Sequence, residues 1–136
     1  MSAPRSYYAA PEGVAVTAVY NRAFGTFFDF FEPRIFVDGV EASVAGWGRT
    51  AVPAATGSHH VHVHTKYFFP RRTGPADYTV DVPPGAYVEL EYRAPIFTFS
   101  RGSLGPPPQR YNGVWPVVIL VGSCLLLIAI LFIAAA

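Results

Sequence analysis

Residues 34–44 read RIFVDGVEASV and contain the strongest short-range structural signal in the chain. Asp38 and Gly39 lie there between two runs of strand-forming residues. A type I′ turn needs a positive φ at both central residues, and Asp-Gly is one of the pairs that adopt it most readily. The stretch therefore predicts two antiparallel strands joined by a tight turn at Asp38-Gly39.

Apolar and polar residues alternate on both sides of this hairpin. The runs are VAVTAVY (residues 14–20), a stretch from His59 to Phe68, DYTVDV (77–82) and AYVELEYR (86–93). A period of two is typical of strands with one buried face, and several short strands at regular spacing indicate an all-β sandwich or partial barrel. We therefore expect a mainly β fold, with a small antiparallel β-sandwich over residues 14–99 after an N-terminal tail (residues 1–13).

A cluster of phenylalanines interrupts the alternation. The run AFGTFFDFF (residues 23–31) has rings at the i, i+3, i+4, i+7 spacing of one helical face, namely Phe24, Phe27, Phe28 and Phe31. Two interpretations stay open. The rings complete the core of the sandwich, or they contact a partner protein or the headgroup layer of a membrane. The pattern does not decide between a strand, a helical turn and an interfacial loop.

The C-terminal run WPVVILVGSCLLLIAILFIAAA (residues 115–136) has no charged side chain. As a helix with about 1.5 Å of rise per residue it would span about 33 Å, enough to cross the hydrocarbon core of a bilayer. Tyr111 and Trp115 precede it as interfacial aromatics, and Gly122 and Ser123 form a small-residue patch suited to packing on another helix. We expect one transmembrane helix over residues 114–136, after a semi-rigid Gly/Pro-rich linker over residues 100–113.

Charged residues near this helix predict its orientation. Arg101 and Arg110 precede the helix and no Lys or Arg follows it, which places the preceding side in the cytoplasm. The N-terminal tail has no apolar export signal. The only cysteine, Cys124, lies within the apolar run, so no disulfide is expected. The sequence thus predicts a single-pass protein of the inner (plasma) membrane with a cytoplasmic N-terminal domain.

Alternating histidines form the only constellation that could carry chemistry. In HHVHVH (residues 59–64), a strand would project His60, His62 and His64 from one face about 7 Å apart. Neighbouring imidazoles can ligate Zn²⁺, Cu²⁺ or Ni²⁺, and they titrate near neutral pH. A metal site, a pH-sensitive contact and a merely wet or partner-facing strand surface are the three interpretations. We favour the last and expect no cofactor.

The composition argues against an enzyme and against a nucleic-acid partner. No phosphate-binding loop, dinucleotide turn, nucleophile elbow or metalloprotease motif occurs. The net charge is +1 and the charges are interspersed, so no basic field attracts nucleic acid. Carboxylates take alternating positions typical of a solvated sheet face, at Asp77, Asp81, Glu89 and Glu91. We expect neither catalysis nor a small-molecule substrate.

The stretch from PRIFVDG through HHVHV to VPPGAYVELEY, residues 33–92, resembles the small β-sandwich PEGA-type domains of bacteria. It departs from their pattern at Gly57-Ser58-His59-His60, where a Pro-Gly pair is usual. The resemblance implies a binding or structural module without catalytic residues. The wider layout, a Gly-Ser-Leu-Gly linker followed by one anchor, is similar to small actinobacterial membrane proteins, among which are accessory subunits of the cytochrome bcc–oxidase respiratory supercomplex.

Two functions are compatible with these features. The first is a non-catalytic accessory or assembly subunit of a bacterial membrane complex, which the layout implies to be a respiratory, cytochrome oxidase supercomplex. Its partners would be integral membrane subunits and the lipid bilayer. The alternative is an independent tail-anchored binding module that presents the His-rich sheet to a metal, a peptide or an envelope-synthesis partner.

Overall fold

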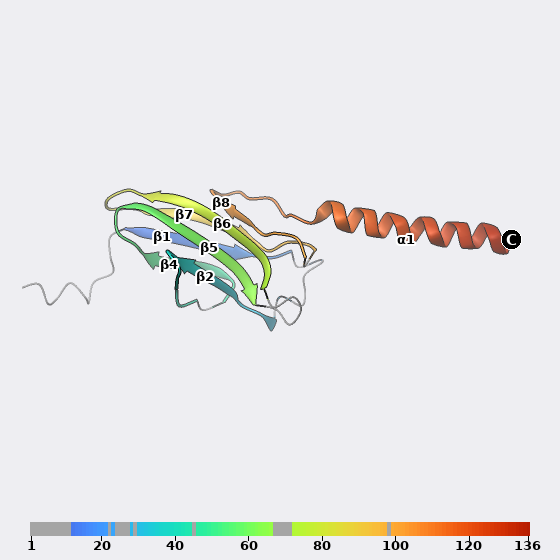
Figure 1. The fold of residues 1–136 in the computed structure, drawn as a ribbon, viewed down its shortest axis with the longest axis horizontal. Coiled ribbons are helices and arrows are strands. Elements are labelled where there is room, and N and C mark those ends of the chain that lie inside the picture. Colours follow the sequence, from blue (N-terminus) through green and yellow to red (C-terminus); the bar gives the residue numbers. More distant parts are fainter. Residues whose placement is uncertain are drawn as a thin grey trace, which may run out of the picture.

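The chain folds into a two-layered β domain followed by one helix. The structure is a computed structural model, and it describes residues 12–21, 23, 28, 30–44, 46–66, 72–97 and 99–136. Figure 1 shows the helix leaving one end of the β domain along its long axis. The mainly β fold with a single C-terminal helix confirms the prediction. The elements are β1 (Gly13–Val19), β2 (Pro33–Val37), β3 (Val40–Glu41), β4 (Gly48–Pro53), β5 (Gly57–Lys66), β6 (Arg72–Val82), β7 (Tyr87–Arg93), β8 (Ser103–Gly105) and α1 (Val114–Ala135).

Two four-stranded sheets face one another, in the orders β4-β1-β7-β8 and β3-β2-β5-β6. Every pairing is antiparallel except that of β1 with β7, which is parallel. The parallel pair joins strands far apart in the sequence. Alternation identifies a strand but carries no information about the direction of its neighbour, so this pairing was not predicted.

The predicted hairpin is present between β2 and β3. Val37 pairs with Val40, and the φ angles of Asp38 and Gly39 are 50° and 80°, as a type I′ turn requires. Asp38 also fastens this turn to β5, because its Oδ1 accepts the His60 backbone N–H at 2.9 Å and its Oδ2 contacts His59 Nδ1. The hydrogen bond with Asp38 raises the pKa of His59, and the same contact lowers the pKa of Asp38.

Inward-facing residues of both sheets form one core. The largest side chains that are fully buried include Tyr92, Ile35 and Leu90, and they lie on alternating strand positions as the period-two pattern predicted. Burying an aliphatic or aromatic side chain contributes about 1.5–3 kcal/mol each. The Tyr92 hydroxyl is satisfied within this core, because it donates to the Gly74 carbonyl at 2.7 Å and lies 3.3 Å from Thr65 Oγ1.

The segment predicted to be a semi-rigid linker, residues 100–113, is attached to the sandwich. Strand β8 extends the sheet at β7, and Leu104 joins the core. Beyond β8, the Gln109 backbone N–H donates to Glu91 at 2.8 Å, and the Asn112 carbonyl accepts the Ile96 N–H at 2.9 Å. Without β8, the edge of β7 would expose unpaired backbone groups, which explains why this short polar-looking segment pairs with it. The sandwich therefore continues close to the start of α1.

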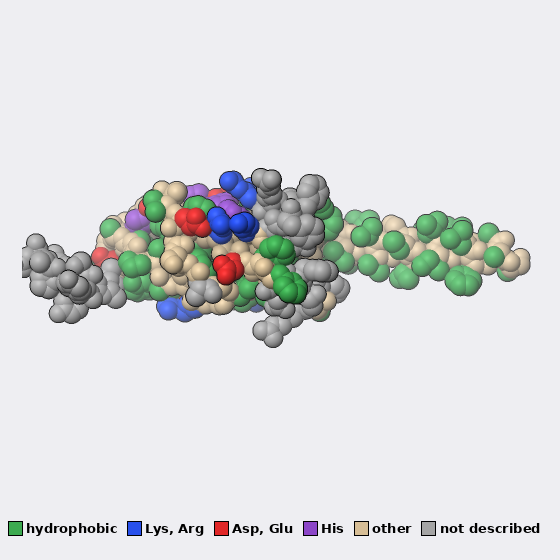
Figure 2. All heavy atoms as spheres, turned by 90° about the horizontal axis from the view of Figure 1, so that it is seen from below, with side chains coloured by type: hydrophobic (Ala, Val, Ile, Leu, Met, Phe, Trp, Pro, Cys, Tyr) green, Lys and Arg blue, Asp and Glu red, His purple; other side chains and the backbone are tan. Residues whose placement is uncertain are grey.

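The C-terminal helix contains 22 residues, has a mean hydropathy of 3.2 and buries none of its residues. Gly113 precedes it with a φ of 86°, and a Cβ at this position would lie 2.7 Å from the Phe97 backbone nitrogen. Only glycine fits such a close, left-handed junction. Figure 2 shows hydrophobic side chains along the whole helix. The helix is therefore long and apolar enough to cross a membrane.

Candidate functional site

The alternating histidines of β5 meet one carboxylate on the neighbouring strand. Register places His62 opposite Asp77 of β6. The His62 Nδ1–H donates to Asp77 Oδ1 at 2.8 Å, and His60 Nε2 lies 3.1 Å from the same oxygen. Because a carboxylate only accepts, this bond fixes the proton of neutral His62 on Nδ1. The spacing in the sequence correctly predicted that the histidines share one face of a strand. It did not predict Asp77 as the shared partner of His60 and His62.

His64 extends this chain of hydrogen bonds toward the interior. Its Nδ1 lies 3.0 Å from His62 Nε2, and with His62 protonated on Nδ1 the bond runs from His64 to His62. Phe36 of β2 stacks on the His64 ring at 5.5 Å between centroids and 20° between planes. An open hollow of about 280 Å³ lies over these side chains and is also lined by His60, Arg72 and Asp77. Figure 2 shows histidine, basic and acidic side chains gathered together on this part of the sandwich.

Burial makes His64 different from its neighbours. Desolvation, together with the nearby His62, Arg72 and Arg34, lowers the pKa of His64 to about 4. Burial works to raise the pKa of Asp77, but the hydrogen bond from His62 and the adjacent positive charges lower it overall. The predicted wet surface is thus correct for exposed His60 and wrong for His64, which is buried. A bulge beside Val63 lets His64 and Thr65 both be buried.

The stability of the sandwich should fall in weak acid because of His64. The pKa of His64 is about 4 when folded and about 6.5 when unfolded, so its stabilising effect is complete above about pH 6.5 and is lost as the pH falls toward 4. Between pH 7.5 and pH 4.5 we expect the free energy of unfolding to fall by roughly 1–3 kcal/mol because of this group. Denaturant titration of the full chain in detergent at both pH values measures it.

Comparison of variants isolates the contribution of His64 from that of His59, whose raised pKa acts in the opposite direction. His64→Gln should flatten the decrease between pH 7.5 and pH 4.5. The matched change His60→Gln, at an exposed position on the same strand, should leave it intact. An equal pH dependence in wild type and His64→Gln would contradict the assignment.

The nitrogens of His62 are both used in hydrogen bonds within the histidine cluster. Among the described residues, no group of three or more His, Cys, Asp or Glu side chains is placed to hold an ion. The nitrogen of His62 that faces His64 is used in their mutual hydrogen bond, and its other nitrogen is used by Asp77. The geometry of the His60, His62 and His64 set is therefore that of a hydrogen-bonded network ending at a buried neutral imidazole.

The phenylalanine cluster divides between core and surface. Phe28 is only 3% exposed and packs with Tyr20 and Trp47, whose indole N–H donates to the Phe28 and Phe31 carbonyls at 2.9 Å. Of the two interpretations that the sequence left open, packing in the core therefore applies to Phe28 rather than contact with a partner or a membrane, because its ring is buried. Phe31 is half-buried. Phe24 and Phe27 lie outside the described residues.

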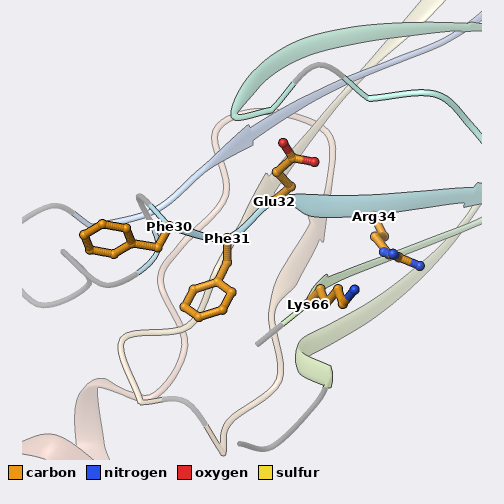
Figure 3. A pocket seen from close by; sticks show the side chains of 5 residues that line it. All are labelled: Phe30, Phe31, Glu32, Arg34 and Lys66. Carbon is orange, nitrogen blue, oxygen red and sulfur yellow. The ribbon is translucent and has the colours of Figure 1, made fainter. Parts of the chain in front are cut away.

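Among the described phenylalanines of this segment, the most exposed is one that the helical spacing left out. Phe30 is 82% exposed. It lies beside an open hollow of about 320 Å³ that is lined by Phe31, Glu32, Arg34 and Lys66. Figure 3 shows the two phenylalanine rings on one side and the Arg34 and Lys66 side chains on the other. Hydrophobic spacing selects rings that share a face, so it cannot identify a ring that points away from that face.

The residues predicted at the membrane boundary occupy two environments. Tyr111 is half-buried, and the Arg93 guanidinium lies 4.7 Å from the centre of its ring. Trp115 is 75% exposed at the first turn of α1. Gly122 and Ser123 are exposed, and a Cβ added at Gly122 would meet nothing within 4 Å.

One carboxylate of the predicted solvated face is also in a different environment. Glu91 is only 9% exposed, since the segment after β8 covers it, and its side chain accepts hydrogen bonds from Gln109 and Arg93. Glu89, two residues earlier, is exposed and pairs with Arg49 at 2.7 Å. Glu91 thus holds the end of the chain segment that leads to α1.

Comparison of the chain with protein-family models, with curated proteins and with solved structures found no match.

Proposed function

We propose that this protein is a non-catalytic accessory subunit of a bacterial membrane protein complex. In this proposal α1 packs at the periphery of the complex in the inner membrane, and the sandwich covers its cytoplasmic side. The observation that carries the proposal is the fastened junction between the two parts. Hydrogen bonds tie the segment before α1 to the sandwich: the Gln109 N–H donates to Glu91, and the Asn112 carbonyl accepts the Ile96 N–H.

The fastened junction has a consequence for binding. Once α1 lies beside a partner helix, the sandwich is held at a high effective concentration over the partner's surface, so weak contacts suffice. Gly122 and Ser123 offer α1 a place where another helix can approach closely. The helix has no Asp, Glu, His, Lys or Arg side chain, so its own residues offer no chain of charged groups for protons or ions. An attachment role agrees with these features.

The resemblance to PEGA-type domains supports a binding or structural module. The layout similar to actinobacterial oxidase subunits makes a respiratory supercomplex the first complex to examine. Arg101 and Arg110, which precede α1, support a cytoplasmic sandwich.

Extraction in a mild detergent tests this proposal. A tagged full chain should be recovered in one large assembly with a fixed ratio to integral membrane subunits, and haem absorption in that assembly would support the respiratory assignment. Recovery of the chain alone as a small protein would contradict the accessory role.

The alternative function, an independent binding module, has one observation in its favour: the hollow over His60, His62 and Phe36. The same preparation distinguishes it. Changing His60, His62 and His64 together to Gln keeps hydrogen-bonding capacity and removes metal ligation. The assembly should keep its composition and its turnover. Loss of a metal or of most turnover, with the chain still present, would favour the binding module.

A further inference from the structure

Exposed aromatic rings gather at the end of the sandwich from which α1 leaves. Three large hydrophobic side chains are exposed on the part of the sandwich that the structure describes: Phe30, Val40 and Phe99. Val40 is the first residue of β3, after the turn that contacts β5 at His60, whereas the start of β2 pairs with the end of β5. The two phenylalanines are 82% and 62% exposed.

Chain geometry places these rings near the start of the helix. Phe30 precedes β2, and the Glu32 carbonyl there accepts the Lys66 backbone N–H at the end of β5. Phe99 belongs to the loop that packs on Gly113, directly before α1. In Figure 1 the end of β5 and the start of β2 both lie at the α1 side of the sandwich. We call Phe30, Phe31, Lys66 and Phe99 the α1-proximal face.

Basic side chains border this face. Arg34 and Lys66 line the hollow beside Phe30 and Phe31, as Figure 3 shows. Arg34 reaches Glu41 at 3.5 Å, and Glu32 also lines the hollow. Lys66 has no hydrogen-bond or ion-pair partner for its ammonium group among the described side chains. Aromatic rings and basic side chains around one hollow match the two layers of a lipid surface, apolar below and anionic above.

We propose that the α1-proximal face docks on the headgroup layer of the leaflet that α1 enters. Phe30 and Phe99 enter the boundary between headgroups and acyl chains, and Lys66 and Arg34 contact the phosphates of anionic phospholipids. This inference rests on the membrane anchor that is part of the proposed function. A lipid surface is the favoured occupant because α1 leaves from this same face, so an inserted helix brings the face to the bilayer.

Lys66 is the only lysine in the chain, which gives a direct measurement. The full chain is reconstituted into nanodiscs of phosphatidylcholine alone and of phosphatidylcholine with 30% phosphatidylglycerol. Its Lys66 amine is then reductively methylated with uncharged reagents, and the N-terminal amine serves as the internal reference. Attraction of one basic residue to an anionic surface corresponds to about a fivefold change in an equilibrium constant. We expect Lys66 to react about fivefold more slowly in the anionic discs, and 0.5 M salt to reverse most of this protection.

Two variants at exposed hydrophobic positions separate docking from a general effect of surface charge. Phe30→Ser should remove most of the protection. Val40→Ser, after the turn that contacts β5 at His60, should leave it unchanged. Protection that survives Phe30→Ser would overturn the docking, since a charged surface alone would then explain it.

The remaining outcomes identify other occupants. Equal protection by inorganic phosphate in detergent would overturn the proposal in favour of a site for free anions. Protection found only in the native assembly would assign the face to a protein subunit. A chain that enters the discs with Lys66 unprotected would overturn this inference alone. A chain that does not enter them would overturn the anchor and this inference together.

Discussion

Replacing Leu125 and Leu126 together with arginine is expected to move the full chain from the membrane fraction to the soluble fraction. Both residues lie near the middle of α1. An arginine at the centre of a spanning helix disfavours insertion by about 2.5–3.5 kcal/mol, so the pair disfavours it by about 5–7 kcal/mol. No carboxylate in α1 offers either guanidinium a partner. Sedimentation and carbonate extraction of cell membranes measure the change.

The matched control changes the same two leucines to alanine, which shortens the side chains without adding charge. This variant should stay in the membrane fraction. Protease added outside intact spheroplasts should leave its sandwich uncut, whereas opened vesicles should expose it, as the positions of Arg101 and Arg110 imply. A double-arginine variant that still resists extraction would show that α1 is not what holds the chain to the membrane. Digestion from outside would reverse the proposed orientation.

Features encoded by neighbouring residues could be predicted from the sequence. The Asp38-Gly39 turn depends on two adjacent φ angles, and the alternation along β6 and β7 depends on residues two apart. The turn was therefore predicted correctly, and so was the burial of Val80 and Val82 in β6 and of Leu90 and Tyr92 in β7. The hydrophobicity of α1 is likewise a local property. Strand pairing is not local, and this is where prediction from the sequence failed.

The pairing of β7 shows the limit clearly. Ser103–Gly105 has no strand-like alternation, and it becomes a strand only because β7 offers it an open edge. Covering that edge also buries Glu91, a carboxylate whose sequence position suggested a solvated face. Both errors therefore have one cause, the location of β8.

The candidate site shows the same division. That His60, His62 and His64 share one face follows from their spacing, but the contacts of His60 and His62 with Asp77 follow from the register between β5 and β6. The burial of His64 depends on a bulge and on the Phe36 ring of another strand. Phe30 could have been suspected only as the ring that falls outside the helical spacing of Phe24, Phe27, Phe28 and Phe31.

The second prediction concerns Tyr92, at the centre of the core. Tyr92→Ala should lower the free energy of unfolding by about 3–5 kcal/mol, because a large buried ring is lost and its space cannot fully collapse. The ring is fully buried and lies against Gly102 and Gly74, whose backbone approaches it too closely for any side chain. The total free energy of unfolding of a small domain is only about 5–15 kcal/mol, so the variant should be partly unfolded at 37 °C. Denaturant titration of the full chain in detergent measures the loss.

Tyr92→Phe separates the hydroxyl from the ring. It keeps the packing but leaves the buried Gly74 carbonyl without the donor that now lies 2.7 Å away, which destabilises by about 1–3 kcal/mol. Gly74 has a φ of 61° and directs its carbonyl at this hydroxyl from the bulged start of β6. Because that bulge lies at the end of the sandwich nearest α1, Tyr92→Phe should also speed amide exchange around Thr73 and Gly74. Equal stability of Tyr92→Phe and wild type would show that the hydroxyl is not needed to hold this end in place.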